Sequence, residues 1–328
     1  DKWCEIYFFV NHFQKEENWD KKIFSVLGGK KIEKKILLKG KFQKQWKLQK
    51  THPLITRYKI NSKFFNEFKF NIKLYISKAL NINFEKDDNI FIRNIDKARN
   101  YRINITPNGA IVPKREFHLE YNLVLRSWCE LVSQMSKKNP KLLKLFRITP
   151  NIRIKFGKEL KDNKKRELST SYPHSDAWVE GPWGMNCYIP FFGDIKNNNL
   201  QFYQPNDKFS ESFMAISPSY KKMQWVMNYY KKIKKLVPQA GYVNLSDYAA
   251  IHNTFRNKNC GTRVSIDTTV FVGNYKPHKD RLKEYTNKIP DIGLTNFVDS
   301  GQYQSDKHAE KKSTYSHYTS RVLRLIKF

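Results

Sequence analysis

Arg263-Val264-Ser265-Ile266-Asp267-Thr268-Thr269-Val270-Phe271-Val272 is the longest strand that the sequence predicts, because Val, Ile and Thr are enriched in strands. Shorter alternating or apolar runs precede it at residues 152–156, 186–190, 200–203, 242–245 and 249–252. Many short strands at close spacing favour a barrel or a double-sheet jelly roll.

The flanking sequence predicts helices and sets the expected domain plan. Residues 63–82 and 117–135 carry apolar side chains at helical intervals, and residues 220–237 look like an amphipathic insert with a basic face. We expect a mainly β fold with some α, in which helices flank a jelly-roll core. The predicted division is a mixed α/β extension packed on the core (1–110), the core itself (111–275) and a polar wrapping tail (276–328).

Composition excludes several classes of protein. The chain has 328 residues, of which 40% are hydrophobic and 15% aromatic, so it can bury a core and is not a disordered chain. No run approaches the ~18 apolar residues that span a membrane, and residues 1–10 lack the pattern of a signal peptide. The four cysteines form no CxxC pair and predict reduced thiols. We therefore expect a cytoplasmic protein without a membrane span.

The formal net charge of +31 raises the hypothesis that the protein binds nucleic acid. Most of the 61 basic residues are lysines, they are spread along the whole chain, and Lys shares AT-rich codons with the abundant Asn, Ile, Phe and Tyr. We therefore do not predict a nucleic-acid partner. A polyanion-binding or nucleic-acid-binding protein on a cupin-like scaffold stays open as an alternative.

A His-x-Asp pair and a distant histidine are the candidate metal ligands. His174 and Asp176 are two residues apart, so in a strand both point to one side. His252 ends an apolar run and could supply a third ligand from an opposite wall. Two imidazoles and one carboxylate suit Fe(II) with open coordination positions, but they also suit zinc. A zinc hydrolase with the same three residues is therefore a second alternative.

Arg263 and Ser265 follow the distant histidine on the last predicted strand and share one face of it. A guanidinium binds a carboxylate through two parallel hydrogen bonds. A dicarboxylate could thus be held at one end by these two residues and chelate the metal with its other end.

These motifs resemble the signature of the Fe(II)/2-oxoglutarate-dependent dioxygenases, in particular the phytanoyl-CoA dioxygenase-like branch and its streptomycin-biosynthesis-type relatives. The similar segments are 172–176 and 252–267, within a region of about 150–272. The resemblance implies a double-stranded β-helix (jelly roll, cupin-like) core. It also implies Fe(II) on His174, Asp176 and His252, and 2-oxoglutarate on Arg263, Ser265 and Thr254, the last at a position that often contacts the cosubstrate.

The same resemblance implies that the protein uses O2 and 2-oxoglutarate to hydroxylate a substrate, with release of succinate and CO2. The default substrate is a small or medium polar metabolite such as a sugar, an amino-acid-like compound or an acyl conjugate. The motifs specify no single substrate and no oligomeric state.

Several residues near the motifs are candidates for contact with cosubstrate or substrate. Asn186 and Tyr188 share one strand face, and Asn186 is the candidate for the cosubstrate. Trp178 and Trp183 flank a Glu-Gly-Pro turn just after the His-x-Asp pair and are candidates for a lid over the metal, although simple loop packing explains them equally well. Tyr203, on the next predicted strand, is a weaker candidate for substrate contact.

Overall fold

The computed structural model describes residues 55–99, 104–106, 108–113, 117–138, 145–157, 172–181, 184–206, 211–217, 219–234 and 236–271. It also describes the backbone of three short strands, β10 (Tyr285–Thr286), β11 (Asn296–Asp299) and β12 (Arg324–Lys327). The expectations for residues 1–54, and most of those for the tail, lie outside these residues.

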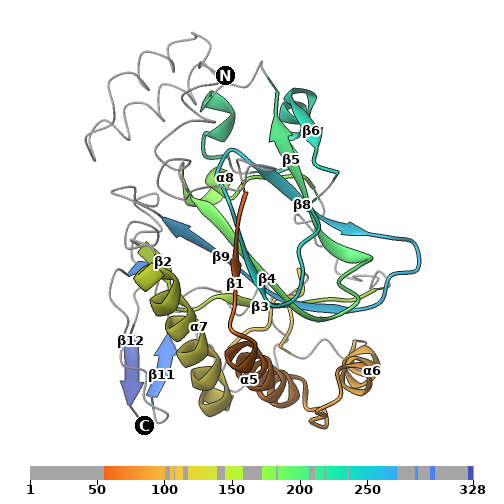
Figure 1. Ribbon diagram of the computed structural model, residues 1–328, viewed down its shortest axis with the longest axis vertical. Helices are drawn as coiled ribbons and strands as arrows, with labels where there is room; N and C mark the ends of the chain where they lie inside the picture. The colour runs from red at the N-terminus through yellow and green to blue at the C-terminus, as the bar shows by residue number, and fades with distance from the viewer. Residues whose placement is uncertain are drawn as a thin grey trace.

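Two antiparallel sheets make up the core (Figure 1). The larger has seven strands in the order β1-β7-β4-β9-β2-β10, with β3 also paired to β9. The smaller has the order β6-β5-β8 and lies at the upper right of the view. The bounds are β1 (Ile55–Lys59), β2 (Leu145–Arg147), β3 (Asn151–Lys155), β4 (Met185–Gly193), β5 (Asn198–Pro205), β6 (Tyr230–Lys232), β7 (Tyr242–Ser246), β8 (Ile251–Arg256) and β9 (Arg263–Phe271). Strands β11 and β12 pair with each other in a separate sheet.

From β3 onward the chain alternates between the two sheets. Strand β3 belongs to the large sheet, and an isolated bridge then pairs His174 with His252 at the edge of β8. Strand β4 returns to the large sheet, β5 and β6 build the small one, β7 returns, β8 crosses back, and β9 closes between β3 and β4. Segments far apart in the sequence therefore face one another between the sheets.

Three helices lie at the lower end of the view in Figure 1: α5 (Ser62–Leu80), α6 (Asp88–Ala98) and α7 (His118–Lys138). The Asn61 side chain caps α5 by accepting from the Phe64 amide at 3.2 Å. Phe65 and Phe68 of this helix each bring their rings within 5.1 Å of Phe191 on β4. The apolar face of α5 is thus buried against the large sheet.

Helix α7 packs beside α5 and reaches strand β2. Asn71 of α5 donates to the Ser127 hydroxyl at 2.9 Å, and the Trp128 indole donates to the backbone oxygen of Arg147 at 2.7 Å. The helices predicted over 63–82 and 117–135, and the mainly β class with antiparallel sheets and flanking helices, are confirmed. In the described part of the chain no helix has the length and apolar character to cross a membrane.

Two local expectations differ from the structure. The basic stretch 220–237 contains turns, the short 3-10 helix η4 (Gln224–Tyr229) and strand β6, because Tyr230–Lys232 extends the small sheet along β5. The strand expected over 249–252 begins only at Ile251. Residues before it form a tight turn, in which the Ala250 amide donates to the Asp247 backbone oxygen at 2.9 Å.

This turn leads into β8 and contains the buried carboxyl group of Asp247. The carboxyl group makes a pH-dependent contribution to the stability of the folded protein. Burial raises the pKa of Asp247 to about 7, while one of its oxygens accepts from the Ala249 amide at 2.9 Å. The folded protein therefore holds this proton more tightly than the unfolded chain. The contribution is full below the unfolded pKa near 4 and is lost as the pH rises toward 7.

We expect Asp247→Asn, which keeps the accepting oxygen, to raise the free energy of unfolding at pH 8 by on the order of 2 kcal/mol, since one pKa unit corresponds to about 1.4 kcal/mol. Urea unfolding at about pH 4 and pH 8 measures this, with the gain expected at the higher pH. An equal effect of the substitution at both values would contradict the burial argument.

Candidate metal centre and its cavity

His174, Asp176 and His252 meet between the two sheets. His174 and His252 exchange backbone hydrogen bonds of 2.9 Å in both directions, which holds the His-x-Asp segment against β8. Asp176 comes directly before the short helix α8 (Ala177–Glu180). The loop is tied down by Ser175, whose hydroxyl donates to the backbone oxygen of Tyr248 at 2.6 Å.

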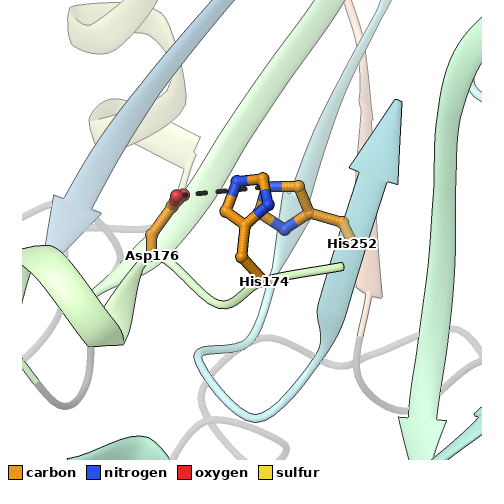
Figure 2. A group of neighbouring side chains, drawn as sticks. All are labelled: His174, Asp176 and His252. Carbon is orange, nitrogen blue, oxygen red and sulfur yellow. Dashed lines mark ion pairs between the residues drawn. The ribbon is translucent and has the colours of Figure 1, made fainter. Parts of the chain in front are cut away.

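The three side chains form a group that could hold a metal ion. One donor atom from each residue lies within 4.8 Å of the others, and the His252 Nε2 atom is 3.9 Å from Asp176 Oδ1. Figure 2 shows the carboxylate of Asp176 directed toward the two imidazoles. The imidazole rings have their centroids 4.4 Å apart. Ligands that share one ion at bonds of about 2.1 Å lie about 3 to 3.4 Å apart, so the three side chains would have to move closer together by small shifts to bind the same ion.

Neighbouring groups orient these ligands. The His174 Nδ1 atom lies 2.8 Å from the backbone oxygen of Tyr172, so a proton on Nδ1 leaves Nε2 free. Asn186 donates to Asp176 Oδ2 at 2.9 Å. The ring of Tyr220 stacks on His174 at 4.4 Å with an interplanar angle of 13°. The ligand set is therefore supported from three sides before any ion binds.

Burial keeps the two imidazoles neutral. Burial and the neighbouring His252 lower the pKa of His174 to about 3, and burial lowers the pKa of His252 to about 4. Burial also raises the pKa of Asp176 to about 6, against the opposing effects of His174 and of the bond from Asn186. Neutral imidazole is the form that binds a metal ion, so no proton has to leave the histidines at neutral pH.

A cavity of about 140 Å³ extends from this group between the sheets. Besides the three residues above, its walls carry mostly polar and charged side chains: Arg147, Asn151, Arg153, Lys155, Val179, Glu180, Asn186, Leu200, Tyr220, Thr254, Arg263, Asp267, Thr268 and Thr269. Asn186, Thr254 and Arg263 are thus brought to the same cavity as the metal-binding group.

Arg263 is the most deeply buried cation of the cavity, with a relative exposure of 1%. Its Nη1 atom donates to the backbone oxygen of Asn198 at 3.3 Å, and its guanidinium lies 5.3 Å from the ring centroid of Tyr188. Its Nε atom is buried without a hydrogen-bond partner in the described part of the chain. A buried guanidinium with free donor capacity is well suited to receive an anion.

Ser265, Tyr188, Trp178 and Tyr203 are not part of the cavity wall. Ser265 is fully buried on β9, two residues from Arg263. Tyr188 is buried, and its hydroxyl donates to Asn199 Oδ1 at 2.9 Å. The Trp178 side chain is wholly buried, and its indole donates to the Phe213 backbone oxygen at 2.7 Å. Tyr203 lies on β5 opposite Lys232 of β6, and Trp183 is outside the described residues.

Arg153 and Asp267, to which the sequence motifs assign no role, form an ion pair in the cavity wall. Arg153 on β3 donates from Nε and Nη2 to the two oxygens of Asp267 on β9, at 2.5 and 3.0 Å. Lys155 lies two residues further along β3 and also lines the cavity. The alternation of apolar and basic residues over 152–156 was a usable signal, because it places Arg153 and Lys155 on one face of a buried strand.

Comparison with known proteins shows only remote similarity. No family model matches the sequence, and no curated protein matches it. Among solved structures, the non-heme alpha ketoglutarate dependent epimerase SnoN from nogalamycin biosynthesis is 12% identical with a TM-score of 0.27, over 54% of this chain and 61% of SnoN.

Two further structures match over more of the chain. An N-substituted L-amino acid dioxygenase from Burkholderia ambifaria AMMD is 11% identical with a TM-score of 0.36, over 69% of this chain and 85% of that one. The non-heme alpha ketoglutarate dependent carbocyclase SnoK from nogalamycin biosynthesis is 10% identical with a TM-score of 0.36, over 80% and 95%. At these TM-scores the likeness decides neither the fold nor the activity of this chain.

Proposed function

We propose that this chain is an Fe(II)- and 2-oxoglutarate-dependent oxygenase. The observation that carries the proposal is that one cavity is lined both by the His174, Asp176 and His252 group and by the buried Arg263. The first can bind a metal ion and the second a carboxylate. A small acid that chelates a metal at one end and carries a carboxylate at the other would engage both.

The same proposal includes a double-stranded β-helix core. Its support is the strand order: β3-β9-β4-β7 on one side, and the His174 bridge, β8, β5 and β6 on the other. Successive segments of the chain wind between these two layers, which is how a double-sheet jelly roll is built. The metal-binding group lies between the layers, where facing strands contribute side chains to one interior.

The residues present fit an Fe(II) ion. His174 and His252 would bind as neutral imidazoles, and Asp176 would bind through the oxygen that faces them, since Asn186 occupies the other. Two histidines and one carboxylate with open positions are typical of non-haem iron oxygenases. When bound, the iron supplies the activation of dioxygen and the oxidative decarboxylation of 2-oxoglutarate.

The protein's own residues would bind and orient 2-oxoglutarate and shield the metal site from water. Arg263 would bind the distal carboxylate, and Thr254 and Asn186 are placed in the wall of the same cavity. We propose Ser265 as a support for Arg263 on the same strand. Tyr220, stacked on His174, restricts solvent access on that side of the metal. Water exclusion strengthens these charge interactions, because they then act in a low dielectric.

The substrate that fits best is a small or medium polar molecule, and hydroxylation is the expected outcome. The cavity walls are mostly polar, and its volume is small. The side of the cavity formed by Arg147, Asn151 and Thr269 is the proposed substrate side, because Arg263 lies at the other end of strand β9. Tyr188, Trp178, Trp183 and Tyr203 stay predictions as substrate contacts, as do the three-part domain plan and the cytoplasmic location.

An anaerobic titration tests the proposal. Adding Fe(II) and then 2-oxoglutarate to the protein should produce the weak visible charge-transfer band of a chelated 2-oxo acid, and neither addition alone should. Aerobic incubation should then form succinate. Zinc in the purified protein, with hydrolytic activity that needs neither O2 nor 2-oxoglutarate, would instead support the zinc hydrolase alternative, which uses the same three residues.

A further inference from the structure

We propose that Lys155 is a second cation of the carboxylate site, and that it takes up a proton from solvent when an anion binds beside Arg263. The inference rests on the proposed function, because 2-oxoglutarate is the anion tested. It concerns a residue to which the sequence motifs assign no role.

The two residues face one another across paired strands. Lys155 is the last residue of β3, Arg263 is the first of β9, and they are direct partners in the antiparallel register. Directly opposed residues in a sheet point to the same face. Both line the cavity, with relative exposures of 9% and 1%. Like charges placed opposite each other destabilise a sheet, so a buried pair of cations here is costly when no anion is present.

The charges around Lys155 leave an excess of positive charge. The charged groups that act on Lys155 are Arg153, two residues earlier on β3, Arg263 and Asp267 on β9, and Arg256 on β8. Asp267 is the one acid among them, and both its oxygens accept from Arg153. Without a bound anion, a proton added to Lys155 therefore places a further positive charge among three guanidinium groups.

These surroundings favour the neutral amine form of Lys155 over its ammonium form. Burial, followed by the charges of Arg153 and Arg263, holds the pKa of Lys155 well below its usual range, with Asp267 acting in the opposite direction. A carboxylate bound to Arg263 would remove the net repulsion and favour the ammonium form. Anion binding and proton uptake by Lys155 Nζ are then linked, so the affinity for the anion falls as the pH rises between the free and bound pKa values.

Calorimetry measures this linkage directly. The Fe(II)-loaded protein is titrated anaerobically with 2-oxoglutarate at several pH values between about 6 and 9, each in two buffers with different enthalpies of ionisation. For the wild type we expect the observed enthalpy to depend on the buffer, corresponding to a fraction of a proton taken up per 2-oxoglutarate. For Lys155→Met we expect no buffer dependence and at least tenfold weaker binding.

Lys155→Arg is the matched variant, because it keeps a cation that does not titrate. It should bind 2-oxoglutarate and lose the buffer dependence, and thermal unfolding of both variants checks that they fold. Buffer dependence that survives Lys155→Arg, or wild-type binding that does not depend on the buffer at any pH, would overturn the inference and leave the oxygenase proposal standing. If the wild-type protein does not bind 2-oxoglutarate at all, both the proposed role of Lys155 and the oxygenase proposal are wrong.

Discussion

His174→Ala is expected to weaken Fe(II) binding by at least about a hundredfold and to abolish succinate formation. Removal of groups that merely orient metal ligands costs about 10- to 100-fold in affinity, and His174 is itself a proposed ligand. The remaining Asp176 and His252, with donor atoms 3.9 Å apart, would hold the ion through two bonds only. Equilibrium dialysis against Fe(II) under anaerobic conditions measures the loss.

His118→Ala is the control for this substitution. His118 is the first residue of helix α7 and is not part of the cavity wall. It should bind Fe(II) as the wild type does, with the same charge-transfer band on addition of 2-oxoglutarate. Unchanged Fe(II) affinity in His174→Ala would mean that the ion, if bound, lies elsewhere, and the proposed site would be abandoned.

Arg263→Met is expected to have opposite effects on ligand binding and on stability. Removing one partner of a buried charge pair costs about 2–5 kcal/mol, which corresponds to a loss of 2-oxoglutarate affinity of about 30-fold or more. In the ligand-free protein the guanidinium is 1% exposed, and its Nε atom has no partner in the described part of the chain. Burying a cation without an anionic partner costs free energy, so an apolar side chain of similar volume is expected to be neutral or stabilising at this position.

The combined result distinguishes a binding residue from a structural one. Without ligand, the Arg263→Met protein should unfold at the same urea concentration as the wild type or at a higher one, while its titration with 2-oxoglutarate shifts to higher concentrations. Arg57→Met is the matched control: this β1 arginine donates to the Val237 backbone oxygen at 3.1 Å and is not part of the cavity wall. Loss of stability together with unchanged 2-oxoglutarate affinity in Arg263→Met would assign Arg263 a purely structural role.

Much of the fold could be read from the sequence where the period of apolar residues is clear. The helices of residues 63–82 and 117–135 and the strands of β3, β4, β5, β7 and β9 follow from such patterns. Strand β6 could not be read in this way, because Tyr230–Lys232 is a short basic segment that is extended only by pairing with β5. The turn before β8 likewise depends on the Asp247 carboxyl group and its bond to Ala249.

The donor set of the site also came from local sequence. His174 and Asp176 are close because they are two residues apart, and Arg263 and Ser265 share a strand for the same reason. That Thr254 and Asn186 reach the same cavity was suggested by their positions next to these motifs. Trp178 shows the limit of such reasoning, because its position after the motif says nothing of the core packing that buries it against the Phe213 backbone.

The sequence by itself determined which chemical groups this protein brings to its site: two imidazoles, a carboxylate and an arginine at the start of a long strand. The tertiary structure alone decided their electrostatic setting. It bonds Asp267 to Arg153 and places Lys155 opposite Arg263, over sequence separations of about a hundred residues, and it stacks Tyr220 on His174. The physical reason is that burial and pairing between distant strands set the charge balance and pKa values of a site, and neither is encoded in any short segment.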